Sequence, residues 1–136
     1  MLRVRLEDGM RFVGHTDDGH AIPMDAAEAG GGKNSGPRPT EVMLSSLAGC
    51  SGMDVIAILR KMRTEPTSLE VEVTAERAEE RPRPFTRIHL AYVVGGDVPE
   101  ENVRKAIDLS LARYCPVANT LNGVAEITSE IRRTPS

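Results

Sequence analysis

The sequence predicts a small protein in which antiparallel strands and helices occupy separate stretches of the chain. Two observations support this prediction. Segments that alternate apolar and polar residues lie next to one another with turn residues between them, and two longer segments carry apolar residues at steps of three and four. The length of 136 residues suits one domain, 1–136, with one core.

Residues 1–25 predict a β-meander. From Leu2 to Leu6 apolar residues alternate with arginines, and Asp8-Gly9 then supplies a hairpin turn before Phe12. Residues 17–19, Asp-Asp-Gly, repeat the turn signal. The same stretch lacks the apolar region of a secretory signal, so we expect a cytoplasmic protein.

Residues 26–38 predict a loop, because their glycines and prolines disfavour both helix and central strand. This loop is either a mobile linker or part of a site. Its position before a helix is typical of phosphate sites. However, Asn34 follows Lys33 where a P-loop needs Ser or Thr, so we expect no nucleotide site.

Residues 39–63 predict a long helix. Its apolar residues fall mainly at helical steps: Met43, Leu47, Val55, Ile56, Leu59 and Met62. The middle, from Leu47 to Met53, is apolar or small on every side, which indicates packing all round. Asp54 would cost about 2.5 to 3.5 kcal/mol near a bilayer centre, so a core helix is favoured over a membrane span. An intertwined dimer would supply the missing cover.

The second half predicts a β-hairpin over 67–95, a second helix over 99–115 and a last strand over 123–132. Residues 68–75 alternate cleanly, and residues 85–94 are their expected antiparallel neighbour. Pro99 and the two acids after it start the helix, and Pro116 ends it.

Composition and charge exclude several classes of function. The net charge is -3 and the basic residues are scattered, so the chain lacks the charge pattern of a nucleic-acid-binding protein. Two Tyr, two Phe and no Trp leave no stacking platform for bases. His15, His20 and His89 lie at no ligand-like spacing from either cysteine, so we expect no metal site and no bound cofactor.

Cys50 and Cys115 are the two cysteines of the chain. In a reducing compartment such a pair is more often a set of free thiols or a catalytic pair than a structural disulfide. Composition alone favours a plainer interpretation, in which each is a small buried apolar residue. A Cys-His hydrolase would need a histidine near Cys50, and His89 alternates with apolar residues as a surface strand residue does.

The residues around the cysteines carry a resemblance to a known family. The two segments are Pro39-Thr40-Glu41-Val42-Met43-Leu44-Ser45-Ser46-Leu47-Ala48-Gly49-Cys50-Ser51 and Tyr114-Cys115-Pro116-Val117. With a meander before the first and a hairpin between them, they resemble the osmotically inducible protein C and organic hydroperoxide resistance family (OsmC/Ohr). The likeness is greatest to its OsmC-like branch and covers nearly the whole chain in element order.

The resemblance implies an α+β fold in which antiparallel sheets wrap around long central helices of an intertwined homodimer. It also implies a thiol peroxidase of the stress response that acts on organic hydroperoxides. Cys50 matches the cysteine whose thiolate attacks the peroxide and becomes a sulfenic acid, and Cys115 matches the resolving cysteine. An external dithiol, of lipoyl type in parts of this family, would restore both thiols.

An attacking thiolate needs a nearby positive charge, because a free thiol with a pKa near 8.5 is mostly protonated at neutral pH. An arginine suits this role. The resemblance implies an arginine tethered by a glutamate near the helix start, and Arg38 and Glu41 are the candidates by position. Arg11 and Lys33 are reserves. The family glutamate directly follows the proline, a place that Thr40 takes here.

A second hypothesis keeps the same fold without catalysis. The protein would then be an OsmC-like dimer that binds a small apolar ligand or senses redox state. Asp54, one turn after Cys50 on the same helix face, is compatible with this alternative, because an unneutralised carboxylate raises the pKa of a neighbouring thiol.

Overall fold

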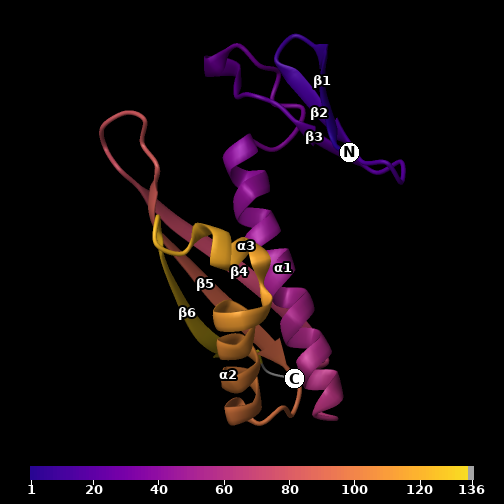
Figure 1. The fold of residues 1–136 in the computed structure, drawn as a ribbon, viewed down its shortest axis with the longest axis vertical. Coiled ribbons are helices and arrows are strands. Elements are labelled where there is room, and N and C mark those ends of the chain that lie inside the picture. The colour runs from indigo at the N-terminus through magenta and orange to yellow at the C-terminus, as the bar shows by residue number, and fades with distance from the viewer. Residues whose placement is uncertain (135–136) are drawn as a thin grey trace. The chain divides into compact units, whose positions relative to one another are not determined.

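The computed structural model describes residues 1–134. The chain forms two compact units, Met1–Leu44 and the part that begins at Ser45, and each is described in turn. The long helix α1, Pro39–Lys61, starts in the first unit and continues through the second (Figure 1).

The first unit is built on a three-stranded antiparallel sheet. Its strands β1 (Arg3–Asp8), β2 (Arg11–His15) and β3 (Ala21–Met24) pair in the order β1-β2-β3. Gly9 and Gly19 take positive φ at the two turns, as the Asp-Gly signals require. Val13 is buried, whereas Val4 and Leu6 on β1 are exposed.

Asp25 ties the loop of residues 26–38 together. This buried carboxylate accepts hydrogen bonds from the backbone amides of Ala26, Lys33 and Ser35 and from the Ser35 hydroxyl. The Ser35 hydroxyl is the largest of several causes that hold the pKa of Asp25 well below its usual range. A short 3-10 helix η1, Glu28–Gly30, lies inside the loop.

Helix α1 buries one face and leaves another open. Its buried residues recur every four positions: Leu47, Ser51, Val55 and Leu59. Met53 on the open face is 73% exposed, so the single chain does not pack the helix on all sides. The helix is long and apolar enough to cross a membrane by length and composition, a test that core helices also pass.

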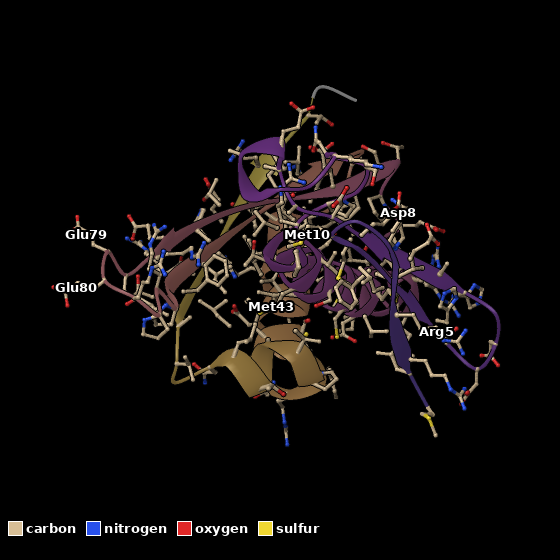
Figure 2. The ribbon with its side chains drawn as sticks, turned by 90° about the horizontal axis from the view of Figure 1, so that it is seen from above. Arg5, Asp8, Met10, Met43, Glu79 and Glu80 are labelled. Carbon is tan, nitrogen blue, oxygen red and sulfur yellow. The ribbon has the colours of Figure 1, made fainter. Side chains whose placement is uncertain are left out.

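The second unit contains a mixed sheet of three strands in the order β4-β5-β6. Strands β4 (Ser68–Arg77) and β5 (Phe85–Gly95) form the antiparallel hairpin, and the charged connection between them carries Glu79 and Glu80 outward at its tip (Figure 2). Strand β6 (Glu126–Arg133) pairs with β5 in parallel. A parallel pair needs a crossover, and α2 (Glu100–Leu109) lies in that connection.

The segment that the sequence predicts as one helix over 99–115 is divided in the structure. The α-helical part ends at Leu109, and a π-helical segment, Ser110–Tyr114, follows. Pro116 does not simply end a helix. It stands in the first turn of α3, Pro116–Leu121, where its missing N–H costs no helical hydrogen bond.

Both α1 and α2 cover the same face of the second sheet. Ser51 of α1 bonds to Tyr92 of β5, and Arg104 of α2 bonds to Ser129 of β6. Tyr92 and Ser129 share this face, because Leu90 pairs with Ser129 and lies two residues from Tyr92. Leu90, Tyr92 and Val94 are fully buried beneath the helices, which makes this the core of the unit. The mixed architecture is the α+β fold that the sequence predicts.

Candidate active site

Cys50 and Cys115 come together within the second unit. Cys50 lies in the middle of α1 and is half-buried. Cys115 is fully buried at the junction between the π-helical segment and α3. Both thiols are free, and Cys50 is one of the neighbours that raise the pKa of the Cys115 thiol. Two residues far apart in the sequence therefore lie near each other in the structure.

The backbone around Cys115 fixes its position. Its amide donates a hydrogen bond to the carbonyl oxygen of Ser110 over 2.8 Å, which closes the π-helical turn. Its sulfur caps α3 by accepting a hydrogen bond from the Ala118 amide at 3.3 Å. Extended backbone angles at Cys115, φ -83 and ψ 106, are those expected before a proline and at an N-cap.

The electrostatics of the pair separate the roles of the two thiols. Burial is the largest cause that raises the pKa of Cys115, to about 11, and the hydrogen bond and the charge of Cys50 raise it further. The Ala118 amide acts in the opposite direction. Cys50 therefore favours the protonated form of Cys115.

A hydrogen-bonded series of polar groups, fully buried except for the half-buried Asp54, lies beside the cysteine pair. Ser110 Oγ donates to Asp54 Oδ2 at 2.9 Å and lies 2.8 Å from Ser51 Oγ. Ser51 Oγ in turn lies 2.6 Å from the hydroxyl oxygen of Tyr92. Burial raises the pKa of Tyr92 to about 12, so this phenol keeps its proton at neutral pH.

An apolar groove of about 460 Å³ runs along the open face of α1. Its lining residues come from α1 and β4: Ser45, Ala48, Gly49, Gly52, Met53, Ile56, Leu69 and Val71. Gly49, which precedes Cys50 in the sequence, lines the groove, whereas Cys50 itself does not. The small residues keep the helix surface hollow, which leaves room for an apolar molecule or side chain.

Arg38 and Glu41 belong to the first unit, at the start of α1. The Arg38 guanidinium donates to the carbonyl oxygens of Asp25 and Gly36 and to Asn34 Oδ1, the last at 2.7 Å. Glu41 Oε1 accepts from the backbone amide of Arg38 at 2.9 Å. The Glu41 carboxylate thus bonds to the backbone of Arg38, and the oxygens of Asp25, Gly36 and Asn34 bond to the Arg38 guanidinium.

The two reserve cations are both engaged in the first unit. Arg11 bonds through Nε to Glu7 at 2.9 Å and through Nη1 to the carbonyl oxygen and the hydroxyl of Ser35. Lys33 Nζ pairs with Asp8 at 3.1 Å on an exposed surface. Of these three candidate cations, Arg38 is the one whose guanidinium bonds to neutral oxygens.

The described part of the chain has no cluster of three or more His, Cys, Asp or Glu side chains arranged to hold a metal. His89 is half-buried on the outer face of the second sheet. Its ring nitrogens bond to Thr128 Oγ1 at 2.6 Å and to Glu130 Oε1 at 2.8 Å. The His89 ring has a partner at each nitrogen.

Sequence reasoning missed Ser51, Ser110 and Tyr92. The sequence offered one signal, since two serines lie at positions where the helical pattern calls for apolar residues. A buried hydroxyl without a partner costs free energy, so two such serines and a core tyrosine should find one another. Their spacing along the chain did not show which would pair.

Comparisons with known proteins define the class of this fold and site. Residues 31–130 match the family model of the OsmC-like proteins. The chain is also 41% identical over 127 residues to protein YhfA of Escherichia coli K12, which covers 93% of this chain and 92% of that protein. The chain therefore belongs to the OsmC-like family, and both cysteines lie inside the matched region.

Solved structures share the fold. A hypothetical protein from Aquifex aeolicus aligns with a TM-score of 0.82 at 28% identity, over 98% of this chain and 96% of that one. The organic hydroperoxide resistance protein OhrB of Bacillus subtilis aligns with a TM-score of 0.70 at 17% identity, over 97% and 98% of the two chains. The second likeness concerns the fold alone.

Proposed function

We propose that the protein is a thiol peroxidase that reduces organic hydroperoxides through Cys50 and Cys115. The observation that supports this best is the closeness of the two cysteines: Ser51, next to Cys50, bonds to Ser110, whose carbonyl oxygen accepts the Cys115 amide, and Cys50 raises the pKa of Cys115. A sulfenic acid formed on Cys50 would have its reductant already beside it. The family supports a redox role, and OhrB of Bacillus subtilis carries hydroperoxide resistance in its name.

The chemistry takes three steps. The Cys50 thiolate attacks the outer peroxide oxygen of ROOH, so an S–O bond forms, the O–O bond breaks and the alkoxide takes a proton to leave as alcohol. The Cys115 sulfur then displaces the hydroxyl of the Cys50 sulfenic acid. A disulfide forms, and the Cys115 proton leaves with that hydroxyl as water. An external dithiol of lipoyl type restores both thiols and becomes a disulfide itself.

The asymmetry of the pair fits this order of events. Cys50 is the half-buried member of the pair, so its sulfur is the one that meets the peroxide. Cys115 is fully buried and holds its proton up to a pKa of about 11. It therefore stays unreactive toward peroxide at neutral pH and reacts only with its neighbour.

Arg38 is the cation that we propose for activation of Cys50. Neutral oxygens from Asp25, Gly36 and Asn34 hold its guanidinium, which stays charged at any physiological pH. Glu41 would act through Arg38, because it fixes the backbone amide of that residue. In this proposal Glu41 is a positioning residue and Arg38 stabilises the thiolate and the departing alkoxide.

The substrate that fits best is an organic hydroperoxide with an apolar group. The groove along α1 is lined mainly by small and apolar side chains, which favour an alkyl or aryl group over hydrogen peroxide. We also propose that the protein works in the cytoplasm as a homodimer. The exposed apolar side chains of β1, among them Val4 and Leu6, support the dimer, and light scattering at micromolar concentration would test it.

A stopped-flow assay tests the activity. Reduced protein is mixed with cumene hydroperoxide or hydrogen peroxide in the presence of a lipoyl dithiol. We expect faster consumption of cumene hydroperoxide, complete loss of turnover in Cys50→Ser, and slow or single-turnover reaction in Cys115→Ser. Equal rates for the wild type, Cys50→Ser and the free dithiol would show that the protein is not a peroxidase.

One observation favours the second candidate function, a non-catalytic dimer that binds a small apolar ligand. The same groove is open and apolar, and Asp54 lies one turn from Cys50. Under this alternative an apolar fluorescent probe would bind to the reduced protein and the peroxide assay would show no rate above the free thiol. Binding of the probe together with fast peroxide turnover would indicate that the groove binds the peroxide substrate.

A further inference from the structure

The polar chain from Asp54 to Tyr92 connects the two structural elements that carry the cysteines. Ser51 directly follows Cys50, and Asp54 lies one turn further along α1. Ser110 begins the π-helical segment, and Cys115 directly follows that segment. Tyr92 lies on β5 beneath both. The hydroxyl groups of this hydrogen-bonded series therefore join α1, which carries Cys50, to the π-helical segment that precedes Cys115.

Ser110 makes this connection with both its backbone and its side chain. Its carbonyl oxygen accepts the amide of Cys115 at 2.8 Å. Its hydroxyl lies 2.8 Å from Ser51 Oγ and donates to Asp54 Oδ2 at 2.9 Å. One fully buried residue thus sets the position of Cys115 on one side and of the Cys50 helix on the other.

The hydrogen bond from Ser110 to Asp54 fixes the direction of the other hydrogen bonds in this series. A serine has one hydrogen to donate, and Ser110 gives its hydrogen to the Asp54 carboxylate. Ser51 must therefore donate to Ser110, and Tyr92 must donate to Ser51. All three hydroxyls point toward the carboxylate, and aligned bonds of this kind strengthen one another in a buried site.

We propose that Ser110, Ser51, Tyr92 and Asp54 form a positioning network that holds Cys50 and Cys115 at bonding distance for disulfide closure. The role rests on the proposed function, since closure of this disulfide is the second step of that reaction. None of these residues touches the peroxide. They act by fixing the two segments that carry Cys50 and Cys115. A displacement of about 1 Å between reacting groups can slow their reaction on the order of 100-fold.

The π-helical geometry supports the same role. A π-helical turn adds a residue to a helix, tends to occur at functional sites and is not the lowest-energy form of an isolated segment. Here it spans Ser110–Tyr114 and ends with the amide of Cys115 bonded to Ser110. The bonds of Ser110 to α1 hold the first residue of this turn in place.

The thiol-disulfide equilibrium of the pair tests the network without peroxide. Reduced protein is equilibrated in glutathione buffers of graded oxidised to reduced ratio, quenched with an alkylating agent and weighed by mass spectrometry. We expect Ser110→Ala to lower the equilibrium constant for the Cys50–Cys115 disulfide at least about tenfold, a rise in potential of about 30 mV. Ser129→Ala is the matched control, because Ser129 bonds to Arg104 away from the pair.

Two shape-conserving variants serve if Ser110→Ala does not fold. Tyr92→Phe removes only the terminal donor, and Asp54→Asn removes the charge that orients the chain. We expect both to shift the equilibrium in the same direction by about threefold or more, with unchanged circular dichroism. An equilibrium constant within about twofold of wild type in all folded variants would overturn the proposal.

A kinetic measurement separates this proposal from the proposed function. After a pulse of cumene hydroperoxide, dimedone traps the Cys50 sulfenic acid. We expect Ser110→Ala to form the sulfenic acid at the wild-type rate and to keep it longer. If the wild-type protein failed to react with peroxide, the proposed peroxidase activity would be wrong. The glutathione equilibria would still show whether the positioning network acts on the disulfide.

Discussion

Cys50, in the middle of α1, raises the pKa of Cys115, which directly follows the π-helical segment. The two thiols are not equivalent. Cys50 is half-buried, whereas Cys115 is fully buried and keeps its proton. Four predictions follow from this asymmetry and from the loop that holds Arg38.

The first prediction concerns alkylation. At pH 8 iodoacetamide should modify Cys50 at least about tenfold faster than Cys115, because burial and the Cys50 contact raise the pKa of Cys115 to about 11. Peptide mapping after a short pulse measures both rates. The Cys115 rate should climb as pH approaches 11, and equal rates at pH 8 would contradict the assignment of roles.

The second prediction concerns stability at alkaline pH. The folded protein holds the Cys115 proton more tightly than the unfolded chain, whose thiol titrates near its ordinary value. The resulting stabilisation is complete below that value and disappears as pH rises toward about 11. We expect the reduced protein to lose about 1 to 3 kcal/mol of unfolding free energy between pH 8 and 11. Urea titrations of wild type and Cys115→Ser, which should lack this loss, measure the difference.

The third prediction concerns the activating cation. Arg38→Ala should slow the reaction of Cys50 with cumene hydroperoxide by about 100-fold or more, because the thiolate and the alkoxide lose their counter-charge. Arg60→Ala, which breaks an exposed ion pair with Glu65, is the matched control. Single-turnover rates at pH 7 give the comparison. Loss of activity in Arg11→Ala with a normal Arg38→Ala would assign the role to Arg11.

Glu41 supplies a sharper control for the same prediction. Its carboxylate bonds to the backbone amide of Arg38, and a glutamine oxygen can accept that bond equally well. Glu41→Gln should therefore keep most of the single-turnover rate. A loss as large as that of Arg38→Ala would mean that the Glu41 charge, and not only its hydrogen bond, acts on the site.

The fourth prediction concerns Asp25. Its carboxylate accepts three backbone amides, so Asp25→Ala should speed hydrogen exchange at Ala26, Lys33 and Ser35 by about tenfold. Asp8→Ala is the control, because it removes only the exposed partner of the Lys33 ammonium group. Mass spectrometry of the peptide that covers residues 25–36 measures these amide exchange rates. Unchanged exchange would show that Asp25 does not hold the loop.

The sequence predicts the elements of this fold well where a period is clear. Strict alternation marks β4 at Ser68–Arg77, and the helical steps mark α1 from Pro39. The pattern could not show that β6 pairs with β5 in parallel, because alternation is the same in both directions. It also could not show the π-helical turn at Ser110–Tyr114, which depends on tertiary bonds of Ser110.

The candidate site also has residues that the sequence predicts and residues that it does not. The family resemblance selected both cysteines, and no local pattern alone would have paired them. The network of Ser51, Tyr92 and Ser110 escaped prediction because each residue is ordinary in its own segment. Their connection exists only after three elements pack together, so it is a property of the tertiary structure and not of any one stretch of sequence.

Peptide mapping after a single dose of peroxide shows whether the Cys50–Cys115 disulfide forms. Reduced wild-type protein receives one equivalent of cumene hydroperoxide, is quenched at once with an alkylating agent and is digested without reductant. We expect an intramolecular disulfide that links the Cys50 peptide to the Cys115 peptide, and its absence in both Cys→Ser variants. Two alkylated, unlinked thiols with the peroxide unconsumed would contradict it.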